Sequence, residues 1–272
     1  MLKKEIIVEK RKKIVDLLQD FGFGYADANR ILRAKDVKIN GKATKDNVFV
    51  EVGDVVDVYY REEMISKKFE IVFESENVAI VYKKAGIESA GEKGLESALG
   101  MIAVHRLDRN TEGLMVFAKN QDSASKLENA FKRNLVRKMY VTEVVGKFVL
   151  PDKIYSAYLV KDDQKSEVKI YQKKVAGSVE IKTKIKCLKT GEQSSFLEVE
   201  LLTGKTHQIR AHLAFLGNAI IGDGKYGKNE NNKKFKQKTQ KLACFRLKFG
   251  RIGIKELDEV QFEKHPEWSI DK

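Results

Sequence analysis

A carboxylate set between two arginines is the part of this chain best suited to chemistry. Segment 103–119 places Asp108 between Arg106 and Arg109, turns at Gly113, and enters an apolar run that predicts a buried strand. Nearby positive charge favours an ionised carboxyl group, so we expect Asp108 to be an anion fixed by a packed strand. Such a group suits a nucleophile better than a general acid. The alternative is a surface aspartate in a salt-bridged turn, which would be preferred for an isolated motif of this kind.

Three other segments carry basic, aromatic and glycine residues that could serve the same site. They are 81–86, 137–142 and 204–213. Taken alone, Tyr140 in the second segment is more simply a core aromatic than a residue that stacks on a base. His207 and His212 in the third are five positions apart, so they do not share a helix face as a metal-binding pair would. We therefore expect no zinc there, and packed or backbone-bonded histidines are the simpler interpretation.

All four segments together resemble the motifs of one enzyme family, the RluA-type pseudouridine synthases. In chain order they are similar to the family's Lys-Pro-Ala-Gly loop, His-Arg-Leu-Asp signature, Lys-x-Tyr strand and Gly-Arg-Thr-His-Gln-Ile-Arg-x-His block. The run 217–227 continues the match, and the resemblance covers about residues 71–249. Motifs that agree in both order and spacing favour a common origin over chance.

The resemblance implies roles for the residues that match. Asp108 would be the catalytic nucleophile, Tyr140 would line the base pocket, and Arg210 would lie against Asp108. Arg106 would fill the gap left by a flipped nucleotide or contact its phosphate, since a base must leave the stack to be reached. Further RNA contacts are expected at Lys205 and His207. The reaction breaks the N1–C1′ bond and remakes it at C5 without a redox step, so we expect no cofactor. Attack on the sugar and attack on the base both remain open.

The sequence departs from the family's motifs at three positions. Glu112 stands where serine is usual, Lys84 replaces the proline of the Lys-Pro-Ala-Gly loop, and Lys205 replaces arginine. Glu112 is the most consequential, because a carboxylate near an RNA backbone is unfavourable unless it points away or pairs with a cation.

The amino-terminal part of the chain predicts a small unit of its own over residues 11–60. Helical spacing predicts a first helix that begins at Ile14 and a second over 26–34, and an Asn-Gly turn at 40–41 predicts a hairpin among alternating valines. Residues 1–50 hold 12 Lys and Arg against 7 Asp and Glu.

This pattern resembles the alpha-L RNA-binding module, named after a ribosomal protein, that precedes the catalytic domain in many family members. The resemblance implies RNA contacts at Arg30 and Arg33. We therefore divide the chain into an RNA-binding module, 1–62, and a catalytic domain, 63–272, with a charged linker at 61–68. A structural cap is the alternative for the module.

From residue 69 onward, short β-branched and aromatic runs recur with few helical patterns between them. The predicted strands are 71–73, 78–82, 114–118, 140–145, 168–171, 181–187 and 196–202, and the predicted helices are 122–131 and 208–216. Many strands with few helices favour an α+β domain around a mixed, mostly antiparallel sheet. By resemblance, this sheet has a central cleft.

Composition indicates a class of binding partner only through the net charge. The net charge of +13 favours a polyanion such as nucleic acid, although a general abundance of lysine would give the same number. Two distant cysteines argue against disulfides, and no apolar run suits a signal peptide or a membrane span. Residues 225–241 hold seven lysines and one glutamate, which favours a mobile loop or a phosphate-binding flap.

We therefore predict an RNA pseudouridine synthase that acts on large-subunit ribosomal RNA. It would be a cytoplasmic monomer with RNA as its partner and no membrane contact. Two alternatives stay open: a non-catalytic RNA-binding or ribosome-assembly factor on the same fold, and the same chemistry on transfer RNA.

Overall fold

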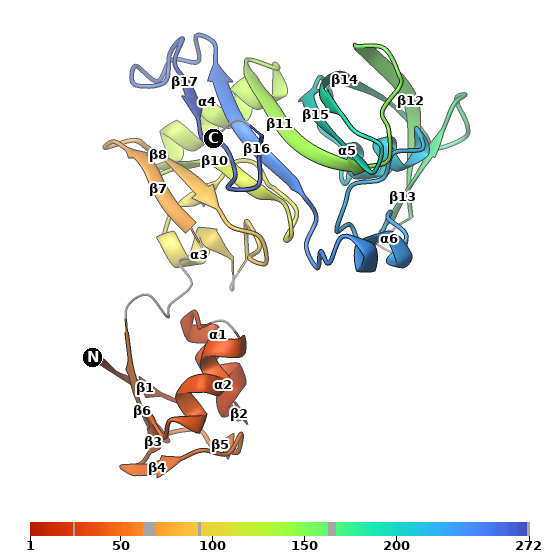
Figure 1. The fold of residues 1–272 in the computed structure, drawn as a ribbon. Helices are drawn as coiled ribbons and strands as arrows, with labels where there is room; N and C mark the ends of the chain where they lie inside the picture. The colour runs from red at the N-terminus through yellow and green to blue at the C-terminus, as the bar shows by residue number, and fades with distance from the viewer. Residues whose placement is uncertain (24, 62–68, 92–93, 163–166, 271–272) are drawn as a thin grey trace. The chain divides into compact units, whose positions relative to one another are not determined.

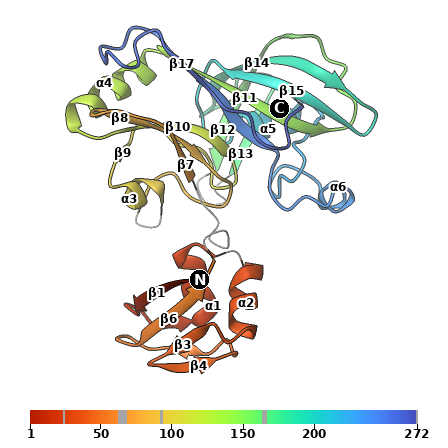
Figure 2. The same cartoon turned by 60° about the vertical axis from the view of Figure 1, so that its left-hand side comes forward.

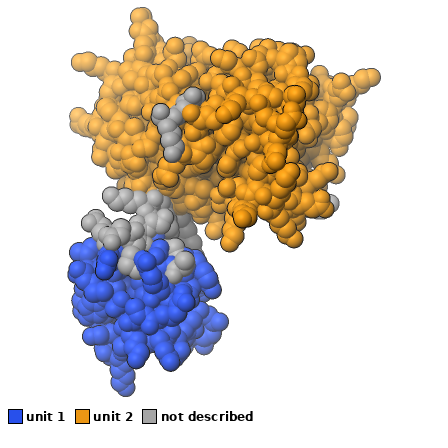
Figure 3. Space-filling model, viewed as in Figure 1, with its two compact units in different colours: residues 1–68 blue, residues 69–272 orange. Residues whose placement is uncertain are grey.

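Two compact units make up the chain, Met1–Lys68 and Phe69–Lys272 (Figures 1 and 3). The structure is a computed structural model, and it describes residues 1–23, 25–61, 69–91, 94–162 and 167–270. The expected linker, apart from residue 61, and the expected boundary after residue 62 lie outside the described residues.

The first unit packs two helices against small antiparallel sheets. Its elements are β1 (Leu2–Ile7), β2 (Lys12–Lys13), α1 (Ile14–Phe21), α2 (Tyr25–Arg33), β3 (Val37–Ile39), β4 (Lys42–Thr44), β5 (Phe49–Val50) and β6 (Val55–Tyr60). Strands run in the order β1-β6-β3-β4, and β2 pairs with β5. The predicted helices and hairpin are present, and the hairpin turns at Asn40 and Gly41, whose φ angles are 49° and 81°.

Strand β1 was not predicted. It is an exposed edge strand with three charged residues in succession, Lys3 to Glu5, so it lacks the apolar alternation that identifies a half-buried strand. Its register against β6 places Lys3 opposite Tyr59 and Glu5 opposite Asp57.

The second unit is an α+β domain around one large sheet, which confirms the predicted fold class (Figure 2). Its strands are β7 (Phe69–Glu74), β8 (Val78–Lys83), β9 (Ile102–Ala103), β10 (Glu112–Ala118), β11 (Val136–Val145), β12 (Lys153–Asp162), β13 (Glu167–Tyr171), β14 (Val179–Thr190), β15 (Ser194–Leu201), β16 (Leu242–Phe249) and β17 (Gln261–Glu263). Its helices are α3 (Leu95–Leu99), α4 (Gln121–Lys132), α5 (Gln208–Phe215) and α6 (Asn229–Lys234).

The sheet consists of two antiparallel halves joined along one parallel pair. The main order is β13-β12-β14-β15-β11-β16-β10-β8-β7. Among the described strands only β10 and β16 run parallel, and they share two register pairs, Glu112 with Ala243 and Gly113 with Cys244. At this crossing Gly113 has a φ of 122°, and a Cβ there would lie 2.3 Å from the Cys244 carbonyl oxygen. Only glycine permits both the backbone angle and the close approach.

The hydrophobic core lies where helices cover the sheet. Leu127 and Ala130 of α4 are buried with Val116 of β10, and the N-cap Asn120 accepts a hydrogen bond from the Ser123 amide. Helix α5 lies at the other half, where Ala211 is buried in a smaller cluster near β13. Helices α4 and α5 therefore cover different halves of the sheet.

Residues 225–241, for which the sequence favours a mobile loop or a phosphate-binding flap, include the short helix α6. The side chain of Asn232 accepts a hydrogen bond from the Gly222 amide and donates one to the carbonyl of Asp223. These contacts attach α6, a polar helix that composition alone would leave in solvent. Lys241 is also paired, with Glu143.

Candidate active site

The loop that carries Asp108 is fixed by buried polar groups around it. Ser89 Oγ accepts a hydrogen bond from the Leu107 amide at 2.9 Å and donates one to the Leu107 carbonyl at 2.8 Å. The fully buried ammonium of Lys83 donates to the carbonyls of Arg109 at 3.0 Å and Ile87 at 2.8 Å. Burial lowers the pKa of Lys83 to about 8. Both neighbours of Asp108 are therefore anchored through their backbones, so the carboxylate is held in place before any ligand arrives.

His105 fixes the start of the same loop. Its Nε2 accepts a hydrogen bond from the Val116 amide on β10 at 3.0 Å, so the neutral ring carries its proton on Nδ1. Burial, reinforced by the charge of Lys138, lowers the pKa of His105 to about 3. The ring packs at 4.7 Å from that of Phe131, and its buried Nδ1 has no hydrogen-bond partner among the described residues.

Asp108 and Asp223 share one guanidinium. Arg210 Nη1 donates to Asp108 Oδ2 at 2.7 Å, while its Nε and Nη2 form a bidentate pair with Asp223 at 2.7 and 3.0 Å. Asp223 is only 1% exposed, whereas the Asp108 side chain is 23% exposed. Burial alone would raise the pKa of Asp223, but the hydrogen bond and charge of Arg210 lower it below its ordinary value. Asp223 thus orients Arg210, and Arg210 orients Asp108.

His207 and Tyr226 complete this side of the site. His207 Nε2 lies 3.8 Å from Asp108 Oδ2, and its Nδ1 lies 2.9 Å from the Tyr226 hydroxyl. The Tyr226 oxygen also accepts a hydrogen bond from the Val168 amide. Burial lowers the pKa of His207, which favours a neutral ring beside Asp108. The His207 backbone takes a φ of 52° as it begins α5.

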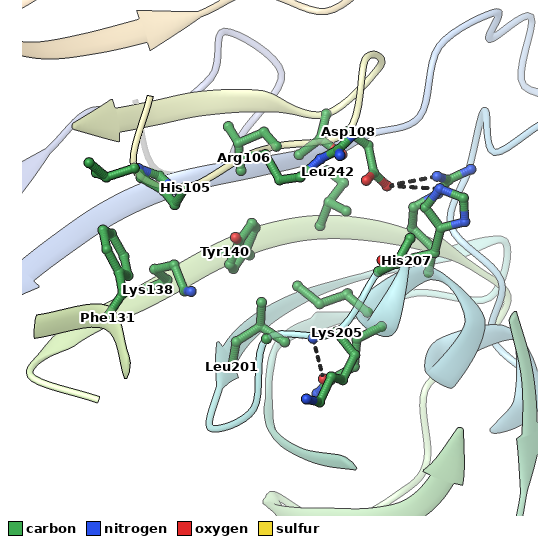
Figure 4. Close-up of a pocket in the computed structure, with 18 of the residues that line it drawn as sticks. His105, Arg106, Asp108, Phe131, Lys138, Tyr140, Leu201, Lys205, His207 and Leu242 are labelled. Carbon is green, nitrogen blue, oxygen red and sulfur yellow. Dashed lines mark hydrogen bonds and ion pairs between the residues drawn. The ribbon is translucent and has the colours of Figure 1, made fainter. Parts of the chain in front are cut away.

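His105, Asp108, His207 and Arg210 line a cavity of about 510 Å³, which Figure 4 shows with Asp108 at one end. Six of the residues singled out from the sequence line it together, namely Arg106, Asp108, Tyr140, Lys205, His207 and Arg210. Asp108 is the one carboxylate among the described lining residues. A smaller cavity of about 330 Å³ also reaches Asp108 and is lined by Arg106, Arg109 and Lys225. The carboxylate is therefore accessible from two cationic cavities.

Tyr140 lies in the middle of the larger cavity, between Asp108 and Lys138 (Figure 4). It is 5% exposed, and burial raises the pKa of its phenol well above the ordinary value. A β-bulge in β16 falls beside it, since Met139 pairs with Arg246 and Tyr140 with Cys244. Bulges commonly adjust the aim of side chains near active sites.

Arg210 lies against Asp108, as the resemblance implied. Among the described residues, neither Arg106 nor Arg109 forms an ion pair with Asp108, and the partner guanidinium comes from Arg210, 102 residues away. Arg109 Nε instead donates to the Gly86 carbonyl at 3.2 Å. Side chains of adjacent residues diverge in a turn, so proximity in sequence did not give proximity of charge.

Glu112 does not face the cavity. It accepts a hydrogen bond from the indole of Trp268 at 2.6 Å, and it does not line either cavity. The replacement of the family's serine is therefore accommodated by the C-terminal segment of this chain rather than by RNA.

Arg30 and Arg33 lie in the other unit, on α2, with exposed side chains. Arg30 pairs with Asp27 at 3.0 Å, and Arg33 Nε donates to the Asn29 carbonyl at 3.2 Å. Their role in RNA binding stays a prediction.

Several residues that position the site were missed from the sequence as individuals. Asp223, Tyr226 and Lys83 all lie within segments that resemble family motifs, which is the signal that could have identified them. Ser89 has no such signal. In the described part of the chain, no cluster of three or more His, Cys, Asp or Glu side chains could hold a metal, and no helix is long and apolar enough to cross a membrane.

Comparison with known proteins agrees with this geometry. Residues 77–215, just over half of the chain, match the family model described as RNA pseudouridylate synthase. The chain therefore belongs to the RNA pseudouridylate synthase family, and it is an RNA-modifying isomerase. A Mycoplasma capricolum protein named as an uncharacterized RNA pseudouridine synthase is 30% identical over 87% of each chain. A ribosomal large subunit pseudouridine synthase C of Vibrio parahaemolyticus is 27% identical over 88% of this chain and 81% of its own.

Solved structures share the fold. Human RNA pseudouridylate synthase domain containing 1 superposes with a TM-score of 0.62 over 73% of this chain and 83% of its own, at 23% identity. Human RNA pseudouridylate synthase domain containing 4 gives 0.59 at 21% identity. At such identities the likeness concerns the arrangement of the elements.

Proposed function

We propose that Asp108 is the nucleophile of uridine isomerisation. The observation that carries this proposal is that Asp108 is the one carboxylate among the described residues lining the larger cavity. Its backbone is anchored on both sides, and one of its oxygens accepts a hydrogen bond from Arg210, which favours the ionised form. The second oxygen has no hydrogen-bond partner among the described residues and can meet a reacting atom.

Tyr140 and the cavity cations are the proposed substrate contacts. The ring of Tyr140 offers a face on which a flipped uracil stacks, because base–aromatic stacking needs no particular sequence. Arg106 is exposed at the mouth shared by both cavities, where it can contact phosphate or fill the gap in the strand. Lys205 adds positive charge at the rim.

The proposed substrate is large-subunit ribosomal RNA, and the first unit is the proposed RNA-binding module. Support comes from the named substrate of several relatives, which cover most of this chain. Transfer RNA is the second candidate for the same chemistry. A map of pseudouridines in total RNA from cells with and without this gene would separate the two.

The test of the nucleophile is Asp108→Asn. Asparagine keeps the shape and can still accept a hydrogen bond from Arg210, but it cannot form the covalent intermediate. We expect no measurable isomerisation, while the thermal melting temperature and RNA affinity change little. Glu112→Gln, which removes a nearby carboxylate outside the cavity, should retain activity. An active Asp108→Asn enzyme would show that another group attacks.

A further inference from the structure

The end of the larger cavity away from Asp108 is built around a lysine that lacks an acidic partner. Lys138 and Tyr140 are two residues apart on β11, so their side chains share the face of the strand that lines the cavity. Figure 4 shows Lys138 beside Phe131, with Tyr140 between it and Asp108. The ammonium lies 5.1 Å from the Phe131 ring centroid.

No described carboxylate lies within ion-pair distance of Lys138, and no described group accepts a hydrogen bond from it. A Cβ at Gly204 would stand 3.5 Å from its Nζ, so the ammonium rests against bare backbone. The neighbouring Arg137, on the opposite face, is by contrast paired with Glu200 at 2.6 Å. Three N–H donors are thus left for a ligand.

The surroundings of Lys138 also favour an anion over a neutral group. Lys132 and Lys205 line the same cavity with exposed side chains, and Asp108 is its one carboxylate among the described residues. Burial lowers the pKa of Lys138, which means that its charge is incompletely compensated in the free protein. A negative ligand would restore that compensation.

We propose that Lys138 binds a phosphate group of the RNA strand next to the target uridine, so that the cavity holds one nucleotide unit beyond the base on Tyr140. Positions i and i+2 of a strand are about 7 Å apart, which is close to the length of one nucleotide unit. The phosphate would take the three free donors, and Phe131 would present an aromatic face beside the adjoining nucleotide. This inference rests on the proposed function only in placing the target uracil at Tyr140.

The test compares two lysines on opposite faces of the same sheet. Lys138→Met removes the charge and keeps the apolar stem. Lys248→Met is the matched control, since Lys248 is exposed on β16 and its register partner is Arg137. Both changes are made in the full chain carrying Asp108→Asn, so that the uridine is not converted during the measurement. The probe is a short single-stranded oligoribonucleotide with one uridine among cytidines.

Equilibrium binding is measured over a range of salt concentrations. Lys138→Met should weaken binding about tenfold and flatten the salt slope by about 0.7, the value for one phosphate contact on a single strand. Lys248→Met should leave both unchanged. An unaltered slope in Lys138→Met would overturn the proposal.

A neutral methylphosphonate placed in turn at each phosphate locates the contact. At one position next to the uridine, the substitution should weaken binding by the lysine-containing protein and have no further effect on Lys138→Met. Additive effects at every position would mean that Lys138 faces a base rather than a phosphate, and the proposal would be wrong. Because no turnover is measured, this outcome is independent of whether Asp108 proves to be the nucleophile.

A direct spectroscopic measurement accompanies the binding series. In protein with 13C-labelled lysine, the ε-methylene signal absent from Lys138→Met reports the titration of Lys138. Addition of the oligoribonucleotide should move its titration midpoint to higher pH, because a phosphate stabilises the charged form. A midpoint that stays in place with RNA bound would contradict a phosphate contact.

Discussion

Arg210 serves two carboxylates with different exposures, and this difference decides how the site responds to mutation. Its bidentate contact is with buried Asp223, while Asp108 receives a single hydrogen bond from the remaining nitrogen. Asp223 also accepts hydrogen bonds from the amides of Lys225 and Tyr226. The stability of the site therefore depends mainly on the Arg210–Asp223 pair. The position of Asp108, the proposed nucleophile, depends on its single hydrogen bond from Arg210 Nη1.

Arg210→Ala should lower the free energy of unfolding by about 3–5 kcal/mol, because it leaves a buried charge without its partner. Adding Asp223→Asn should recover much of that loss. Adding Asp108→Asn should recover less, because solvent already reaches Asp108. Urea denaturation of the single and double variants measures these differences. Equal recovery by both second changes would show that Asp223 is not the main partner.

Two buried histidines should make the protein sensitive to mild acid. Burial lowers the pKa of His105 to about 3 and of His212 to about 4, against 6.5 for the ordinary value. Below pH 6.5 the unfolded chain binds protons that the folded chain does not, so stability falls as the pH drops. Each histidine contributes about 1.4 kcal/mol per pH unit.

Urea denaturation between pH 6.5 and 5, above the range of most carboxylates, measures this slope. His105→Gln and His212→Asn, whose amides can replace Nε2 and Nδ1 in the hydrogen bonds with Val116 and Thr183, should each reduce it. A wild-type stability that is flat over this window would contradict the burial of both rings as neutral groups.

At the scale of elements, the site depends on the parallel contact between β10 and β16, which no local sequence pattern predicts. The sequence predicted β8, β10, β11, α4 and α5 because apolar runs or helical spacing mark them. It did not predict β12, nor β16, whose apolar positions are interrupted by Arg246 and Lys248. The parallel contact between β10 and β16 joins segments far apart in the chain, so propensity carries no information about it.

Gly113→Ala should lower the free energy of unfolding by at least about 3 kcal/mol, since the new Cβ would meet the Cys244 carbonyl. Gly146→Ala is the control, because Gly146 also has a positive φ, 78°, but has nothing within 4 Å of the added carbon. That change should cost about 1–2 kcal/mol, the penalty of the backbone angle alone. Thermal denaturation of the two variants separates the steric clash with Cys244 from the strain of the backbone angle. Similar losses of stability in both variants would argue against a close approach of β10 to β16.

The residues of the candidate site were also predicted only in part. Asp108, Tyr140 and Arg210 were predicted through resemblance to family motifs, and the structure places them around one cavity. Asp223 and Ser89 were not assigned roles, because a buried polar residue looks like any turn residue until its partners are known. The partner of Asp108 followed from the motif around Arg210 on α5, and the local charge of Arg106 and Arg109 would not have identified it.

At the scale of the whole molecule, the chain combines a catalytic unit with a small basic unit that has its own core. That core includes Ile14, Leu18 and Ile31, and all its members among the described residues belong to the first unit. The first unit thus has the packing of an independent module, as the proposal of a separate RNA-binding module requires.

Removal of residues 1–62 should weaken binding to folded RNA and flatten its salt dependence, because fewer basic contacts release counterions. Activity on a short single-stranded substrate should suffer less. Arg30→Gln combined with Arg33→Gln, which keeps the unit folded, should reproduce part of the effect. Gel-shift titrations at several salt concentrations measure both, and unchanged affinity and slope would favour a structural cap.

The parallel contact between β10 and β16 affects the order in which the second unit folds. Asp108 precedes β10 in one half of the sheet, while Tyr140 and Arg210 belong to elements of the other half. Strands β7, β8 and β10 pair with near neighbours in the sequence, whereas the junction of β10 with β16 joins segments far apart in the chain, which is the slow kind of contact. The site is therefore completed only when the two halves dock. A refolding chain should regain secondary structure and nonspecific affinity for polyanions before it regains catalysis, so that enzymatic activity reports the last step of assembly.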